Sequence, residues 1–185
     1  MNPIKTKIFL CTLSMFLVTA LLTSCAAKPV EWNGKTVYTH VTMGIDETNL
    51  FGYVGAVDYV FVGKVTEAAY AVTEENDKSS YKIHVEKNIK GELVSDIQGS
   101  KHGGILEDGT MLLYESDKIQ ETGLPEVGET YIFMAYGQSD GELLLSEFWG
   151  TVEYTEESLA QYENYVQNQF AVERERFVSK YDASA

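Results

Sequence analysis

Two thiols and three imidazoles are the side chains that could do nucleophilic, metal-binding or acid–base chemistry near neutral pH. The thiols belong to Cys11 and Cys25, and the imidazoles to His40, His84 and His102. None of them falls in a recognisable motif, because the sequence contains no H-E-x-x-H, paired cysteines, P-loop or G-x-S-x-G pattern. The residue spacing therefore predicts no catalytic residue, no metal ligand and no cofactor.

Cys25 stands at the end of an apolar segment at the N-terminus. Lys5 and Lys7 precede an uncharged, almost wholly apolar run over residues 8–22. This run is shorter than the roughly 20 residues that a membrane-spanning helix needs. A basic start followed by an apolar run of this length is typical of an export signal.

The end of that segment, Leu22-Thr23-Ser24-Cys25, resembles the bacterial lipobox, in which an aliphatic residue and two small residues precede a cysteine. The resemblance implies a signal peptide over residues 1–24, cleavage before Cys25, and lipidation of Cys25 with acyl chains such as palmitate. Cys11 would leave with the signal peptide, so the mature monomer could form no disulfide, zinc–thiolate site or cysteine nucleophile. A plain signal peptide with an incidental cysteine, or an uncleaved anchor, is the alternative.

The charge of the chain excludes one class of partner. The whole sequence carries 14 basic and 28 acidic residues, and removal of Lys5 and Lys7 with the signal peptide changes the formal charge from −14 to −16. Such an acidic surface repels phosphate backbones, so we expect no nucleic-acid partner. An apolar content of 44% indicates a folded core.

Three residues are candidates for the rim of a ligand site. His102 precedes Gly103-Gly104 in an expected loop, and Tyr136 and Trp149 belong to the last expected hairpin, with Trp149 beside Gly150. Core packing is the alternative role for the two aromatic residues. His40 and His84 fall on the outward faces of expected strands, where a half-exposed polar residue is ordinary.

The segments that would position these residues alternate with a period of two. Strands are expected in 36–43, 57–72 and 81–91, and a helical turn capped by Asp46 or Thr48 is expected in 46–56. Residues 130–154 form the clearest expected hairpin, with its turn at Ser139-Asp140-Gly141. Its strands are apolar on both faces, which predicts that they are central or covered.

The C-terminal segment changes to a helical period. Thr155 is the expected N-cap, and a helix over 155–180 would carry one apolar stripe, formed by Leu159, Tyr162, Val166, Phe170 and Phe177. With 25–35 as a lipidated spacer and 36–154 as the main domain, the sequence predicts a mainly β protein. We expect an OB-like small β-barrel with a long C-terminal α-helix packed on it.

Three stretches in order resemble the netrin-like or TIMP-like domain. They are "VDYVFVGKVTEAAY", "YKIHVEKNIKGE" and "LPEVGETYIFMAYGQSDGELLLSEFWG", which together cover roughly residues 50 to 150. The likeness is greatest to lipoproteins of Gram-positive bacteria that carry this domain without cysteines. It implies an OB-fold barrel flanked by helices.

Animal members of that family inhibit metalloproteases through a free N-terminal cysteine. That role does not carry over simply, because Cys25 would bear lipid and no Cys-x-Cys follows it. We therefore expect a non-enzymatic, lipid-anchored binding domain on the extracellular face of the cell membrane, with an envelope protein or cell-wall component as partner. The alternatives are a regulator of an envelope protease and an envelope hydrolase that uses carboxylates.

Overall fold

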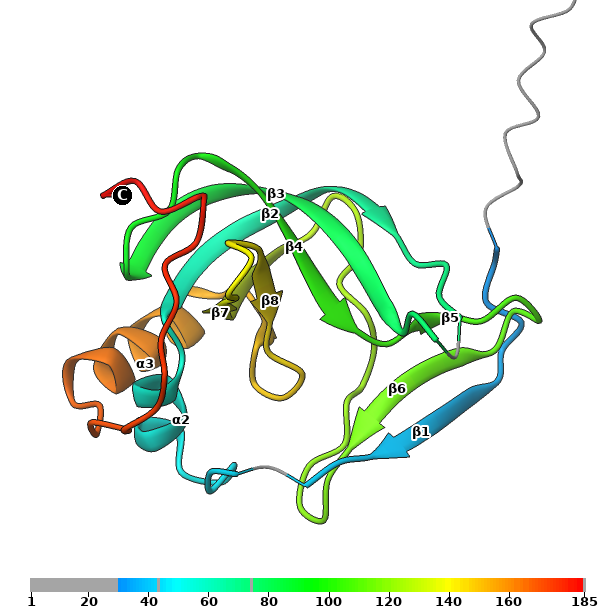
Figure 1. Cartoon of the computed structure of the whole chain (residues 1–185), viewed down its shortest axis with the longest axis horizontal. Helices are drawn as coiled ribbons and strands as arrows, with labels where there is room; N and C mark the ends of the chain where they lie inside the picture. The colour runs from blue at the N-terminus through cyan, green and yellow to red at the C-terminus, as the bar shows by residue number, and fades with distance from the viewer. Residues whose placement is uncertain (1–29, 43, 74, 185) are drawn as a thin grey trace, which may run out of the picture.

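The computed structural model describes residues 30–42, 44–73 and 75–184. The lipobox-like segment and Cys25 lie outside these residues. The described chain is mainly β, with one closed barrel, a separate three-stranded sheet and two helices on one side of the barrel (Figure 1). None of the described helices is long and apolar enough to cross a membrane.

Five strands close the barrel. They are β2 (Tyr59–Ala69), β3 (Lys78–Lys90), β4 (Asp96–His102), β7 (Thr130–Gly137) and β8 (Leu143–Leu145). The order is β2-β3-β4-β8-β7, and β7 pairs with β2 to complete the circle. The β4–β8 pairing is parallel and the other four are antiparallel. A short strand, β9 (Thr151–Glu153), continues the sheet beside β7.

Two apolar cores explain why the central strands are apolar on both faces. Inside the barrel, Phe61 stacks on Phe133 with ring centroids 5.4 Å apart. On the outside, the alternate residues Val60 and Ile132 pack with Tyr53 in a second core. Because successive side chains of a strand point to opposite faces, β2 and β7 contribute to both cores. The expectation that the hairpin strands are central is confirmed.

Two helices cover the outer core (Figure 1). They are α2 (Leu50–Ala56) and α3 (Glu156–Gln167). The N-cap of α2 is Asn49, whose side chain accepts from the Gly52 N–H, so the expected cap at Asp46 or Thr48 was wrong. The cap of α3 is Thr155 as expected, and Thr155 and Ser158 form a reciprocal capping box.

The expected helix over 155–180 was wrong beyond Gln167. After its C-cap, Asn168, the chain continues without regular secondary structure and runs along α2 and the barrel (Figure 1). We call residues 169–182 the C-terminal strap. Phe170 of the predicted apolar stripe is 55% exposed, and its N–H donates to the Phe51 carbonyl. Tertiary hydrogen bonds have replaced helical ones here, so the C-terminal helix is short.

The three-stranded sheet lies at one end of the barrel. It is ordered β1-β6-β5, from β1 (Thr36–His40), β6 (Met111–Glu115) and β5 (Gly104–Ile105). The expected spacer already contacts this part, because the Asn33 N–H donates to the Gly109 carbonyl at 2.9 Å. The folded domain thus begins before residue 36.

The hairpin turn has the expected place. Gly141 has φ +83°, and the Gln138 N–H donates to the Glu142 carbonyl at 2.9 Å across the turn. Positive φ is free of strain for glycine, which is why the Asp-Gly pair predicted this turn correctly.

Candidate functional site

A cleft of about 330 Å³ lies at the end of the barrel where β4 and β8 finish. We call it the Trp149 cleft. Residues 119–123, which follow β6, form one wall, and residues 147–149, after β8, form the other together with Thr151 and Val152 of β9. Lys101 of β4 also lines it. The volume is near the lower end of the roughly 300–1,000 Å³ typical of ligand pockets, so it suits one side chain or a small molecule.

A buried ion pair joins the two walls to the barrel. The Lys101 ammonium donates to the Glu121 carboxylate and to the Glu147 backbone carbonyl, the latter at 3.1 Å. The second carboxylate oxygen of Glu121 accepts the Tyr114 N–H at 3.0 Å. Burial raises the pKa of Glu121, against the opposing attraction of Lys101. These bonds link β4 to both walls and hold the walls in place. The side chains of the pair are only 1% and 4% exposed, so the pair is closed to solvent.

Trp149 sits in a tight turn between β8 and β9. It has φ +51° and is the one non-glycine residue with positive φ among those described. A side chain on the next residue, Gly150, would collide with the backbone of Ser146, so this turn depends on glycine there. The indole N–H donates to the Glu47 carbonyl at 2.8 Å, and the Tyr162 hydroxyl donates to the Trp149 carbonyl at 2.8 Å. These bonds fix the ring, yet it stays 39% exposed.

His102 forms a second polar group behind the cleft. Its Nδ1 lies 3.0 Å from Asp77 Oδ2, which also accepts from the Tyr114 hydroxyl. Burial acts to raise the pKa of Asp77, but the hydrogen bonds from Tyr114 and His102 outweigh it and hold this pKa below its usual value. An ionised carboxylate only accepts, so His102 Nδ1 must carry the hydrogen. The other ring nitrogen, Nε2, lies 3.9 Å from Glu147 Oε1.

The structure brings two of the three predicted rim residues to the same end of the barrel. Glu147 lines the cleft together with Trp149, and its carboxylate faces His102. Tyr136 does not line this cleft. Its ring lies 5.0 Å from the Arg174 guanidinium and packs in the outer core, because its position on β7 faces the helices and the strap. Tyr136 therefore lies apart from this cleft, and its role at a ligand rim stays a prediction from the sequence.

The sequence did not single out Lys101, Glu121, Glu147 or Thr151. One signal was available for Lys101, because Ile97, Gly99 and Lys101 alternate along β4 and share its inner face. Glu147 carried no such signal among 28 acidic residues. Its role depends on contacts between distant segments.

The other two histidines lie at the surface. His84 pairs with Asp96 at 2.9 Å, and His40 lies 3.5 Å from Asp117, with both imidazoles half-exposed. Over residues 30–42, 44–73 and 75–184, no group of three or more His, Cys, Asp or Glu side chains is arranged to hold a metal ion.

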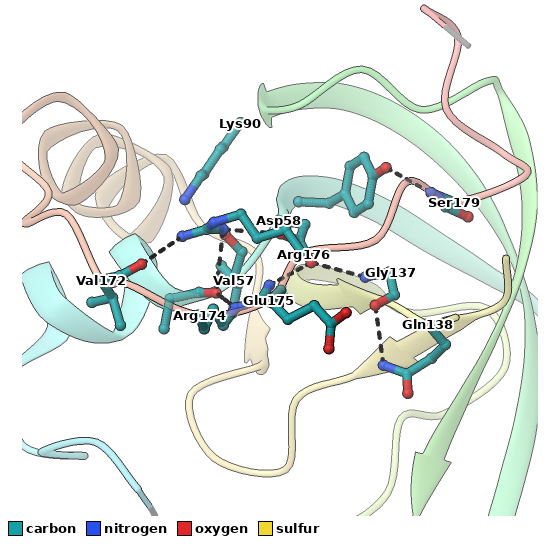
Figure 2. A network of polar contacts seen from close by, with 12 residues as sticks. Val57, Asp58, Lys90, Gly137, Gln138, Val172, Arg174, Glu175, Arg176 and Ser179 are labelled. Atoms are coloured by element: carbon teal, nitrogen blue, oxygen red, sulfur yellow. Dashed lines mark hydrogen bonds and ion pairs between the residues drawn. The ribbon is translucent and has the colours of Figure 1, made fainter. Parts of the chain in front are cut away.

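A larger network fastens the C-terminal strap to the barrel (Figure 2). Asp58, 10% exposed, accepts from Arg174, Arg176 and the Gly137 N–H. Arg176 also donates to backbone carbonyls at the end of α2, including that of Gly55 at 2.7 Å. The carbonyls at a helix C-terminus lack helical partners, and Arg176 supplies donors to them. We assign this network to stability, because its groups satisfy one another.

A second cleft of about 320 Å³ lies beside the three-stranded sheet. Trp32, Tyr38 and Leu124 are among its lining residues. Trp32 is 52% exposed and Tyr38 is 39% exposed. This aromatic surface is therefore close to the start of the described chain.

A scan against protein-family models finds no match, and a search of curated proteins finds no similar sequence.

Proposed function

We propose that this protein is a lipid-anchored, non-enzymatic binding domain on the outer face of a bacterial cytoplasmic membrane. Its ligand is a component of the cell envelope, either a protein or a cell-wall fragment, and it binds in the Trp149 cleft. The observation that carries this proposal is the cleft itself, where a fixed but exposed indole lies beside a largely buried carboxylate, that of Glu147. Aromatic rings with a few placed polar groups are typical of ligand sites.

The proposal includes a finer description of the fold. The closed five-strand barrel has a crossed strand order with one parallel pair, which supports an OB-type, TIMP-like barrel. OB barrels are five-stranded Greek-key barrels that bind ligands on one face and on adjoining loops. The Trp149 cleft is lined by Lys101 of β4, by the segment after β6 and by residues at and before β9, so it would be a site at the end of the barrel rather than on that face. Metalloprotease inhibition lacks this support, because no Cys-x-Cys follows Cys25.

The position of the first described residues is compatible with a membrane anchor. Val30 follows Cys25 by five residues, which span about 18 Å at full extension. A lipid on Cys25 would therefore keep Trp32 and Tyr38 close to the headgroups. Tryptophan and tyrosine are enriched at that interface, so their exposure near the start of the domain supports this placement.

The anchor is tested by replacing each of the two cysteines by alanine in turn and separating the membrane and soluble fractions of the cells. Cys25→Ala should leave an uncleaved precursor without lipid, whereas the matched control Cys11→Ala should be processed and membrane-bound like the wild type. Equal processing and lipid labelling of the two variants would remove the anchor from the proposal.

The cleft is tested by site-specific photo-crosslinking on intact cells. A photoreactive residue replaces Gln120, an exposed residue of the cleft wall, and in the control it replaces Gln161, an exposed residue of α3. We expect an envelope component to be captured from position 120 and not from 161. The same products from both positions would show that the cleft has no specific ligand.

One observation favours an envelope hydrolase as the second candidate. Asp77, His102 and Glu147 form a carboxylate–imidazole–carboxylate array, in which His102 could act as a general base. A hydrolase should release fragments from peptidoglycan or peptides, and His102→Asn should abolish that release. In a binding protein the same array catalyses no reaction, so purified protein should leave both substrates intact.

A further inference from the structure

We infer that the Trp149 cleft selects a ligand with a primary ammonium group on a flexible chain, such as the lysine side chain of a peptide. The inference deepens the proposed function and depends on it, since it names the chemistry of the ligand at the same cleft. Four features of the described residues support it: the net charge of the walls, the lack of a hydrogen-bond donor to the Glu147 carboxylate, the hydroxyl of Thr151 and the position of Trp149.

The charged side chains that line the cleft leave one negative charge. They are one lysine and two glutamates. Lys101 and Glu121 neutralise each other in a buried ion pair, so Glu147 supplies the remaining charge. Asp77, just behind His102, adds a further negative charge to this end of the barrel. An anionic ligand would be repelled here, and a cation would be attracted.

The carboxylate of Glu147 has no hydrogen-bond donor within reach among the described residues. Its side chain is only 15% exposed, and its nearest basic group is His102 Nε2 at 3.9 Å, which is too far for a hydrogen bond. The ring hydrogen on His102 Nδ1 is bonded to Asp77, and Nε2 is too far from Glu147 for a hydrogen bond. An N–H donor from a ligand would supply the hydrogen bond that this largely buried carboxylate lacks.

Thr151 adds an unsatisfied group to the same wall. Its hydroxyl is the one buried side-chain polar atom of the described chain with no hydrogen-bond partner. Thr151 lines the cleft, so its hydroxyl is close to the space that a ligand would occupy. A buried hydroxyl without a partner costs about 1–3 kcal/mol, so a ligand that supplies this bond is favoured.

The indole of Trp149 completes a site for a cation. Its ring lines the cleft, stays exposed and is fixed by the bond from its Nε1 to Glu47. Tryptophan is the strongest aromatic partner for a cation over its face. The ring alone would also accept a quaternary ammonium, but Glu147 needs N–H donors, which only an ammonium with hydrogens provides. This difference separates lysine from its trimethylated form.

The test measures binding of three small probes by the full chain in non-ionic detergent micelles, using two-dimensional NMR of the indole and amide N–H groups. The probes are Nα-acetyl-lysine methylamide, its ε-trimethyl analogue and the neutral Nα-acetyl-norleucine methylamide. We expect the lysine probe to shift the Trp149 indole signal with the highest affinity. Glu147→Gln should weaken that affinity about tenfold or more, as for loss of a charge-assisted hydrogen bond. The matched control Glu157→Gln, on the exposed face of α3, should bind like the wild type.

The outcomes separate this inference from the proposed function. Equal affinity for the lysine and norleucine probes, or for wild type and Glu147→Gln, would overturn the ammonium inference. If the photo-crosslink from position 120 persisted in that case, the cleft would still be the binding site, with a ligand of different chemistry. Absence of both the crosslink and any shift of the Trp149 signal would overturn the proposed function together with the inference.

Discussion

Lys101 and Glu121 form an ion pair that is almost wholly enclosed, with side chains 1% and 4% exposed. The pair joins β4 to the loop after β6 and gives the Trp149 cleft its rigid base. Removing two charges from water costs free energy, so such a pair is stable only when its donors and acceptors are hydrogen-bonded. Glu121 is satisfied by Lys101 on one oxygen and by the Tyr114 N–H on the other.

Lys101→Met should destabilise the protein by about 3–5 kcal/mol, because it leaves the Glu121 carboxylate buried without its counter-charge. Burial already raises the pKa of Glu121, and loss of Lys101 removes the attraction that opposes this rise. A carboxyl whose pKa is raised by folding binds its proton more tightly in the folded state. The variant should therefore recover stability as the pH falls from 7 toward 5.

Urea unfolding at several pH values measures this effect. The double variant Lys101→Met with Glu121→Met removes both charges, and it should be more stable than Lys101→Met alone. A single variant as stable as the wild type at pH 7 would contradict an uncompensated buried charge.

Arg176→Ala should lower the free energy of unfolding by about 2–3 kcal/mol. The change removes the 2.9 Å ion pair with Asp58 (Figure 2). It also removes the hydrogen bonds to the carbonyls of Gly55 and Val57. The control is Glu175→Ala in the same strap, which should change stability by less than about 0.5 kcal/mol, as exposed residues usually do. Hydrogen exchange should also rise in α2 for Arg176→Ala only. Equal effects of the two changes would show that the network does not hold the strap.

Replacement of two glycines of α2 by alanine should change the stability of the protein in opposite directions. A side chain at Gly55 would collide with the carbonyl oxygen of Phe170 in the strap, whereas at Gly52 it would meet only the Asn49 side chain at 3.8 Å, an ordinary contact. Gly52→Ala should stabilise the protein by about 0.5–1 kcal/mol through helix propensity. Gly55→Ala should destabilise it by about 1–3 kcal/mol, as overpacking does.

Thermal unfolding and limited proteolysis distinguish the two glycine variants. We expect a lower Tm and faster cleavage within residues 169–182 for Gly55→Ala alone. A rise in Tm for both variants would show that the strap does not pack against α2 in solution.

Lys90 should make stability depend on pH on the alkaline side. Burial, followed by repulsion from Arg176, lowers the pKa of Lys90 to about 8, against about 10.4 for an unfolded chain. Between these values the unfolded chain binds more protons than the folded one, so the free energy of unfolding rises with pH. This rise in the free energy of unfolding should be smaller than the full shift in the pKa of Lys90 implies, because the amine is partly exposed and screened by solvent.

The measurement for Lys90 is urea unfolding at pH values from 7 to 9.5, compared with Lys90→Met. Tyrosine titration affects both proteins alike, so the difference between their slopes isolates the lysine. Parallel slopes would mean that Lys90 keeps an ordinary pKa in the folded state.

Local patterns predicted the elements whose structure depends on a few neighbouring residues. The turn at Asp140-Gly141 needs only a residue that accepts positive φ, and the start of α3 needs only a hydroxyl at Thr155. The apolar pattern on both faces of 130–137 also indicated burial on two sides, which the two cores confirm. Export and lipidation at Cys25 remain a prediction from the sequence.

Contacts between distant segments decided the rest. The strap follows a helical apolar pattern, but Asp58 and the carbonyls at the end of α2 offer Arg174 and Arg176 better partners than a helix would. The candidate site likewise joins His102, Glu147 and Trp149 only because β4 and β8 pair in parallel and end at the same edge of the barrel. The sequence by itself determined the mainly β character and the segments able to form strands, since side-chain alternation is a local property. Closure of the barrel, the end of the helix and the cleft depended on tertiary structure, because their energies come from groups that meet only after the chain has folded.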